Sequence, residues 1–276
     1  MAIAKEILQK LNRFATAFRE ARDRGANESD TVMSLVKFFE EVLEYNSLKG
    51  EISKELAIKD RYCDLALKID GAVQILVECK ASGLKGLVDK HIEQAENYAS
   101  RSGVRWVLLT NAIEWRLYHL TFVESEGIVH DLAFELNLLE ELERDPEAAW
   151  AKLSLLGRNA IAKGLLEEYW DERKALSPAS VVKALFTQDV LAVLRRELRR
   201  EAKALLDIED VFAAVRDVLS KEALMEAGDI TVKKRRKKRR KVTRTKTDPA
   251  TGATASEEVE EEVDDGDDGA GSECVT

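Results

Sequence analysis

The sequence predicts an α/β fold built on a mixed sheet, followed by an all-helical region and a disordered charged tail. Three observations predict this organisation. Helix-like and strand-like hydrophobic spacing alternate through roughly the first 125 residues, as in an α/β unit. Apolar residues then recur only at helical spacing, and the periodicity stops after Gly228. We therefore expect an α/β domain over residues 1–130, a helical region over 131–228 and a tail over 229–276.

Spacing and turn signals divide the α/β part into elements. The first two helical segments carry apolar residues three and four positions apart, and either Asn27 or Ser29 fits the N-cap of the second. Trp106 and Trp115 fall on a second predicted hairpin and are expected in the core. The predicted elements are helices at 1–24, 30–45 and 88–101, and strands within 61–80 and at 104–110 and 113–120.

The composition argues against a membrane protein and against a structural zinc site. No stretch approaches the roughly 18 apolar residues that a membrane span needs. The first 20 residues carry charges throughout and form an amphipathic pattern rather than a signal peptide, so we expect a cytoplasmic protein. None of the three cysteines lies at a zinc-binding spacing, and the three histidines are scattered.

The net charge of −9 hides an uneven distribution. Residues 233–246 contain eleven Lys or Arg, and residues 247–276 contain eleven acids and no Lys or Arg. The body is therefore mildly acidic, which does not favour binding driven by phosphate contacts alone. We interpret the basic run 233–241 as a non-specific nucleic-acid contact, with masking by the acidic tail as an alternative.

The hairpin within 61–80 contains the candidate catalytic residues. Odd positions in both of its strands are apolar and are expected to form the buried face. Because paired residues share a face, a three-residue loop at Asp70-Gly71-Ala72 is expected, since a two-residue turn would mix the faces. Asp64 then lies opposite Glu78, and Lys80 follows on the same face.

This arrangement suits metal-assisted phosphodiester hydrolysis. A divalent cation removes the repulsion between two neighbouring carboxylates, and magnesium accepts one or two carboxylates together with waters and phosphate. A lysine beside them can orient a water molecule or stabilise developing charge. The alternative is a solvated strand face with weak ion pairs, which spacing alone favours.

The order of motifs resembles the PD-(D/E)xK nuclease signature. Asp64 is followed after thirteen residues by Glu78-Cys79-Lys80, and downstream Gln94–Tyr98 matches the QxxxY motif of RecB-type members. Asn27–Thr31 resembles the helix start that holds the family's first acid, and Gly103–Tyr118 resembles the following hairpin. The family it most resembles is the N-terminal nuclease domain of type I restriction enzyme R subunits, over roughly residues 25–125. The resemblance implies a restriction-endonuclease-like core.

The resemblance also implies a metal site. Asp64 and Glu78 would bind Mg²⁺, or Mn²⁺ as a substitute, with help from the backbone carbonyl of Cys79. Lys80 would act on the attacking water. Glu28 would complete the metal shell or a second site, although Glu41 or Glu44 could supply that carboxylate instead, and a helix N-terminus favours an acid in any case.

Downstream residues would position DNA. Gln94 and Tyr98 lie one helical turn apart, on one face with His91, and the resemblance implies that they position DNA or active-site residues. An ordinary helix pair is the alternative, and His91 is as well explained by local packing as by a DNA contact. Cys63 stands where the motif has proline, which the family tolerates. In a reducing cytosol Cys63 and Cys79 are expected to be small buried core residues rather than a disulfide.

We therefore expect a magnesium-dependent endodeoxyribonuclease that acts in restriction or defence. Type I R subunits carry a helicase motor, but this sequence has no GxxxxGK[ST] phosphate loop. The resemblance then implies a stand-alone relative that acts on DNA, with a separate motor or specificity protein as a further partner. Two alternatives stay open: a catalytically silent DNA-binding or adaptor module with the same fold, and an RNA-directed nuclease.

Overall fold

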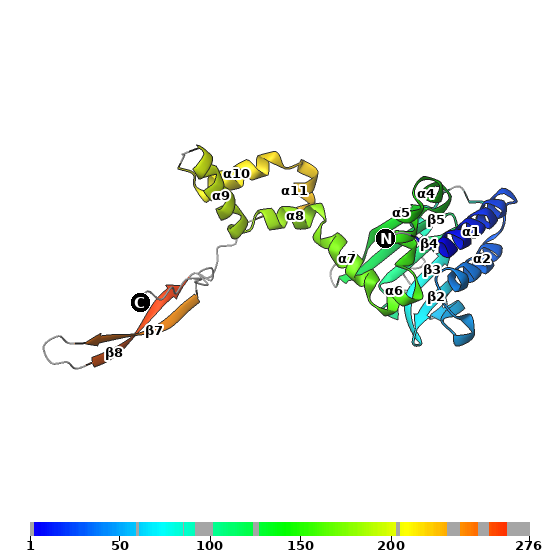
Figure 1. Ribbon diagram of the computed structural model, residues 1–276, viewed down its shortest axis with the longest axis horizontal. Helices are drawn as coiled ribbons and strands as arrows, with labels where there is room; N and C mark the ends of the chain where they lie inside the picture. Colours follow the sequence, from blue (N-terminus) through cyan, green and yellow to red (C-terminus); the bar gives the residue numbers. More distant parts are fainter. Residues whose placement is uncertain are drawn as a thin grey trace. The chain divides into compact units, whose positions relative to one another are not determined.

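The computed structural model describes residues 3–58, 61–84, 86–91, 102–123, 127–202, 205–230, 238–247 and 254–263. The chain divides into two compact units, Met1–Lys174 and Ala175–Thr276, which are described separately (Figure 1). The first unit is a mixed sheet flanked by helices, and the second contains helices and a two-stranded hairpin. The predicted α/β fold class, with a helical C-terminal region, is confirmed.

The sheet of the first unit has six strands in sequential order. They are β1 (Ile52–Ile58), β2 (Arg61–Ile69), β3 (Ala72–Cys79), β4 (Trp106–Thr110), β5 (Glu114–Val123) and β6 (Gly127–Asn137). Every neighbouring pair is antiparallel except β3 and β4, which are parallel. A parallel pair needs a crossover, and here residues 80–105 make it. The C-terminal ends of β3 and β4 therefore meet at one edge of the sheet.

Helices cover one face of this sheet. The first unit contains α1 (Lys5–Asp23), α2 (Glu28–Glu41), α4 (Leu138–Arg144), α5 (Pro146–Ser154), α6 (Arg158–Ala162) and α7 (Leu165–Ala175). Figure 1 shows α1 and α2 side by side next to the sheet. Phe18 and Phe38 pack together between the helices, and Phe38 also contacts Trp115 on β5. The apolar stripe of the first predicted helix is thus the surface that joins α1 to the main core.

The second helix begins where the sequence indicated. Asn27 is the N-cap of α2, and its side-chain oxygen accepts a hydrogen bond from the backbone N–H of Asp30 at 2.9 Å. Trp106 and Trp115 are both buried, as predicted for core residues.

The turn of the β2–β3 hairpin differs from the prediction. Ile69 pairs with Ala72 across a two-residue turn, Asp70-Gly71, in which both residues have positive φ. This is the backbone conformation that favours an Asp-Gly turn between twisted strands. A bulge between Leu67 and Lys68 then shifts the register by one residue and leaves Gln74 without a paired residue on β2. The bulge supplies the one-residue change of register that the longer loop was expected to supply, so the predicted three-residue loop is wrong.

The register beyond the bulge agrees with the prediction. Leu65 pairs with Val77, and one further step in the same register brings Asp64 opposite Glu78. The second face of the hairpin is less exposed than expected, however, because Ala66 and Leu76 are fully buried there. They belong to a second apolar cluster that includes Leu87, Val104, Val107, Leu109, Tyr118 and Leu120. Glu78 therefore lies on a covered face and not on a solvated one.

Two outer strands were not predicted. β1 extends the sheet beyond β2, and β6 pairs along the whole of β5. Residues 131–137 are strand rather than helix, although Leu136 and Leu139 carry helical spacing. Helices α4 to α7 contribute residues to the main core of the first unit, Met1–Lys174. The spacing signal failed here because a strand runs directly into α4.

The second unit has four helices in its described part. They are α8 (Pro178–Leu185), α9 (Gln188–Ala202), α10 (Ile208–Val218) and α11 (Lys221–Ala227). Their apolar residues form a separate small core around Phe186, Leu191 and Val211. Across the described residues, no helix combines the length and apolar character that a membrane crossing requires.

Part of the charged tail lies within the described residues. Within 229–276 the structure pairs β7 (Lys238–Thr247) with β8 (Thr254–Val263) as an antiparallel hairpin. In this register a strand rich in Lys and Arg is paired with a strand rich in Glu.

Candidate active site

The candidate site lies at the end of β3, where the parallel pair β3–β4 reaches the edge of the sheet. Glu78 is the second-to-last residue of β3 and Lys80 follows its end. The backbone N–H of Lys80 donates to the carbonyl oxygen of Thr110 at 2.8 Å, which continues the parallel pairing beyond the strand. The backbone at the ExK sequence is therefore held by the sheet.

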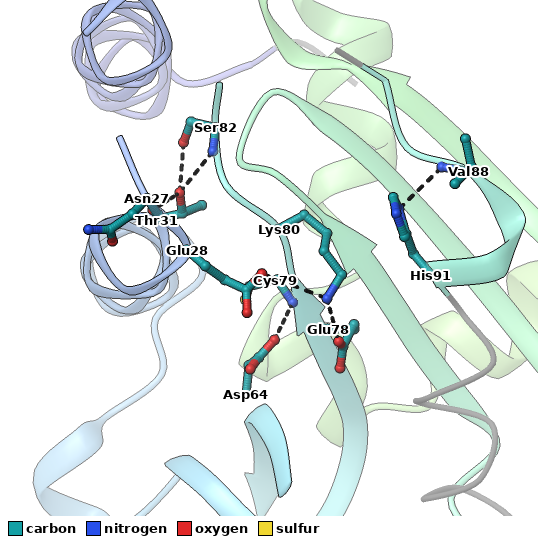
Figure 2. A network of polar contacts seen from close by, with 10 residues as sticks. All are labelled: Asn27, Glu28, Thr31, Asp64, Glu78, Cys79, Lys80, Ser82, Val88 and His91. Carbon is teal, nitrogen blue, oxygen red and sulfur yellow. Dashed lines mark hydrogen bonds and ion pairs between the residues drawn. The ribbon is translucent and has the colours of Figure 1, made fainter. Parts of the chain in front are cut away.

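Lys80 joins two acids from different parts of the chain (Figure 2). Its Nζ lies 2.6 Å from Oε1 of Glu78 and 3.8 Å from Oε2 of Glu28 at the start of α2. The Glu78 side chain is 1% exposed, whereas that of Glu28 is 49% exposed. The lysine thus bridges a buried carboxylate and a carboxylate that borders solvent.

Asp64 reaches the same place from β2. Its Oδ2 accepts a hydrogen bond from the backbone N–H of Cys79 at 2.7 Å, which fixes the carboxylate beside the ExK segment (Figure 2). A hydrogen bond from a backbone amide to a carboxylate is a strong one, because the acceptor is charged. Asp64, Glu78 and Lys80 therefore converge on one patch, with Glu28 beside them.

Burial dominates the electrostatics of Glu78. It raises the pKa of this carboxyl to about 7; Lys80 opposes the shift, and the charges of Asp64 and Glu28 add to it. Among the described residues, Oε2 of Glu78 has no hydrogen-bond partner and is buried. A buried oxygen without a partner is costly, and a cation in this position would relieve that cost.

Lys80 stays charged in this setting. Burial alone would lower its pKa, but the hydrogen bond and charge of Glu78, followed by the charges of Glu28 and Asp64, outweigh burial and raise it. His91, in the short 3-10 helix η2 (Asp89–His91), accepts a hydrogen bond from the Val88 N–H at 3.3 Å through Nδ1. Burial and the positive charge of Lys80 lower the pKa of His91. A neutral imidazole beside Lys80 adds no further positive charge to the site.

The two cysteines near the site are core residues, as predicted. Cys63 and Cys79 are fully buried and not joined in a disulfide. Burial raises the pKa of Cys63 to about 12 and also raises the pKa of Cys79. Because the thiolate is the nucleophile, neither cysteine is suited to covalent catalysis at neutral pH.

A buried hydroxyl pair fastens α2 to the segment after Lys80. The Oγ1 of Thr31 lies 2.9 Å from Oγ of Ser82 and accepts a hydrogen bond from the Ser82 backbone N–H at 3.0 Å. Both residues are 1% exposed. A Cβ at Gly83 would lie 3.4 Å from Cα of Gly25, so the two loops approach each other closely there. This joint sets the start of α2, and with it Glu28, against the ExK segment.

The comparisons with known proteins bear on the segment that contains this site. Residues 33–130 match the family model of the type I restriction enzyme R protein N terminus. The matched segment includes β1 to β5 and thus Asp64, Glu78 and Lys80, but it begins after Glu28. Comparison with curated proteins and with solved structures gave no match. The resemblance found in the sequence is therefore confirmed, and this R-protein N-terminal family indicates a restriction-related nuclease domain.

The resemblance to PD-(D/E)xK nucleases implies a divalent metal, and the donor types at this place are those that a magnesium ion accepts. No group of three His, Cys, Asp or Glu among the described residues is close enough together to hold a metal. Magnesium needs fewer, because it takes one or two carboxylates and keeps several waters. Asp64 and Glu78 meet that requirement, and the buried Oε2 of Glu78 is an oxygen in need of a partner. Glu28 forms an ion pair with Lys80, so it would lie beside these two metal-binding carboxylates and not between them.

The predicted residues divide into those the structure brings together and those it leaves out. Asp64, Glu78, Lys80 and Glu28 meet at one place. The alternative acids lie elsewhere: Glu41 pairs with Arg13, and Glu44 accepts from Asn159. Gln94 and Tyr98 lie outside the described residues. Sequence reasoning missed Thr31 and Ser82, although a threonine one turn after the N-cap and a serine two residues after the ExK lysine were visible in the sequence.

Replacing Thr31 by valine will lower the free energy of unfolding by about 1–3 kcal/mol, because the Ser82 N–H then loses its buried acceptor. Urea denaturation of the full chain measures this change. Ser34→Ala is the matched control, since the Ser34 hydroxyl also bonds within α2 but at a more exposed position, and its effect should stay within about 0.5 kcal/mol. Equal effects of the two substitutions would show that the Thr31–Ser82 joint adds no stability.

Proposed function

We propose that the first unit is a magnesium-dependent endodeoxyribonuclease acting in restriction or defence. The single observation that supports this best is the meeting of Asp64, Glu78 and Lys80 at one sheet edge inside the segment that matches the R-protein N-terminal family. Ordinary strand-face ion pairs are exposed and weak. Here Glu78 is buried and its Oε2 has no hydrogen-bond partner among the described residues, which is hard to explain by stability and easy to explain by a ligand.

We assign each side chain a role in the proposed reaction from its position. The Asp64 carboxylate is held in place by the Cys79 N–H, and Glu78 is held by Lys80. These two acids would bind Mg²⁺, or Mn²⁺ in its place, together with the backbone carbonyl of Cys79. Magnesium bound there would supply Lewis-acid stabilisation of a phosphate oxygen and a more acidic water.

Lys80 provides the positive charge. Its Nζ is a donor held near the two carboxylates, and a raised pKa keeps it protonated at neutral pH. From there it can orient a water molecule and stabilise negative charge that develops on a phosphate. Glu28 borders solvent on the other side of Lys80 and would adjust the lysine's position or contribute to a second metal.

The substrate and partners are part of the proposal. We assign DNA as the substrate because the matching family is named for restriction enzymes, and Gln94, Tyr98 and His91 as residues that position it. We further propose a separate motor or specificity protein as a partner, which would supply ATP-driven movement or site recognition where these are needed. We place the protein in the cytoplasm, where restriction acts.

Asp64→Asn tests the assignment with the least change of shape. Wild type should nick supercoiled plasmid with magnesium, and the Asn variant should be slower by roughly 10²-fold or more, because it loses one charge of the metal pair. Digesting DNA and RNA of matched length side by side separates a DNA nuclease from an RNA-directed one. If the Asn variant cleaves as fast as wild type, Asp64 is not part of the site.

A second candidate is a catalytically silent DNA-binding or adaptor module with the same fold. The observation in its favour is that no three metal-binding side chains cluster within the described part of the chain. Such a module would bind DNA equally well with and without magnesium and cleave neither DNA nor RNA. The intact set of Asp64, Glu78 and Lys80 favours the nuclease.

A further inference from the structure

The hairpin of β7 and β8 separates charge by strand. β7, with the sequence KRRKVTRTKT, carries six Lys or Arg and no acid. β8, with the sequence TASEEVEEEV, carries five Glu and no base. The two strands form a sheet of their own. A sheet of this kind has little apolar material, and its two strands carry opposite charge.

The register of the two strands places residues of opposite charge across from each other. Val242 pairs with Val259, and in the same register four basic residues stand opposite a glutamate. The four oppositely charged pairs are Arg239–Glu262, Arg240–Glu261, Lys241–Glu260 and Arg244–Glu257. A slip of one residue in either direction would place Val242 opposite a glutamate. The observed register therefore keeps the valines together and the charges complementary.

Such a hairpin is easily opened by a stronger polyanion. An isolated two-stranded hairpin is marginally stable in water, and ion pairs that salt can screen add little to it. A DNA duplex carries one negative charge per about 1.7 Å, whereas a strand advances about 3.4 Å per residue. Basic residues that bind a duplex also release its condensed counterions, a gain that glutamates cannot match.

We propose that β7 is a binding segment for the phosphodiester backbone of nucleic acid, and that β8 is its built-in competitor. By register, β8 places glutamates opposite basic residues that nucleic acid would neutralise. Because a short connection joins the strands, β8 competes at an effective concentration in the millimolar range. The competition suppresses weak binding and yields to long, densely charged polymer. This inference goes beyond the proposed nuclease function and does not depend on it.

Neutralising the paired glutamates tests the competition. The variant changes the four glutamates that stand opposite a basic residue to glutamine, namely Glu257, Glu260, Glu261 and Glu262. The full chain is titrated against a short fluorescent DNA duplex, without magnesium, and anisotropy is followed over a range of salt. The variant should bind on the order of tenfold more tightly than wild type, with a steeper dependence on salt, because its basic residues no longer carry glutamates as counterions.

The chain offers a matched control. Asp264, Asp265, Asp267 and Asp268 follow β8 directly, and changing these four acids to asparagine removes the same charge from outside the paired register. This control should change affinity by much less than the β8 variant. Equal gains in the two variants would mean that overall charge, and not strand pairing, limits binding. No gain in the β8 variant would overturn the proposal, as would binding to an acidic protein in preference to nucleic acid.

Hydrogen exchange gives a second readout that does not use variants. In the free full-length protein, amides of both β7 and β8 should be protected relative to a chain with no pairing. Adding excess duplex without magnesium should remove protection from Glu257–Val263 and not increase it. Protection of β8 that persists in the complex would contradict displacement. Because neither experiment contains magnesium, both outcomes stand whether or not the site at Lys80 cleaves DNA.

Discussion

Replacing Glu78 by glutamine will make the metal-free protein more stable at high pH, and the gain will grow as pH rises. Burial raises the pKa of Glu78 to about 7 in the folded chain, above its ordinary value of 4.5. The folded state therefore holds this proton more tightly than the unfolded state does. The stability that the proton provides is fully present below about pH 4.5 and is lost as pH rises through about 7. Glutamine carries no such charge, so the loss disappears.

The size of this effect follows from the shift. Between about pH 5 and about pH 8, the difference in free energy of unfolding between the glutamine variant and wild type should increase by roughly 2–3 kcal/mol. Urea denaturation at several pH values, with the metal chelated, measures it. Glu40→Gln, at an exposed position of α2, is the control and should leave the pH dependence parallel to that of wild type. Parallel curves for Glu78→Gln would show that burial does not hold this proton.

Magnesium should reverse the order of stability of wild type and the Glu78→Gln variant. A ligand that binds only the folded state adds stability that rises with its concentration. Wild type with ionised Glu78 should therefore gain stability on addition of magnesium, increasingly so above about pH 7, where the carboxylate no longer has to lose a proton. The glutamine variant should gain much less. Equal gains in both proteins would place the metal elsewhere.

Lys80→Ala will reduce magnesium-dependent DNA cleavage by roughly 10²–10⁴-fold. The loss has two causes. The donor near the two carboxylates is gone, and the negative charges of Glu78 and Glu28 lose the positive charge between them. Initial rates on a fluorescent duplex at saturating magnesium measure the effect.

The controls for Lys80→Ala separate chemistry from folding. Lys37→Ala removes an exposed lysine from α2 and should cleave at the wild-type rate. The far-ultraviolet circular dichroism spectrum shows whether the Lys80 variant retains its fold. A folded Lys80→Ala protein that cleaves at the wild-type rate would remove Lys80 from the mechanism.

Sequence patterns predicted the parts of the fold that depend on local signals. Asn27 caps α2, and the strands of the second hairpin alternate with a clear turn between them, so these elements were correctly placed. The turn at Asp70-Gly71 was misjudged, because the face argument could be satisfied either by a longer loop or by a bulge. Only tertiary packing distinguishes those two solutions.

Other features depend on contacts between distant residues. β6 was missed because its pairing with β5 overrides a spacing that looked helical, and α4 to α7 join the first unit through the core. The burial of Glu78 was missed for a similar reason, since Leu76 on the same face is covered by residues from after the crossover. The residue types of the site were thus predictable, but their burial and the Thr31–Ser82 joint were not.

The most direct test of the central claim is the nicking of supercoiled plasmid by the full chain, with magnesium present and with magnesium chelated. Wild type, Asp64→Asn and Lys80→Ala are purified in parallel and compared at equal concentration. We predict that wild type nicks and then linearises the plasmid only with magnesium, and that both variants leave it supercoiled over the same period. Cleavage that persists in the chelated sample, or that both variants retain, would contradict a metal-dependent site at Asp64, Glu78 and Lys80.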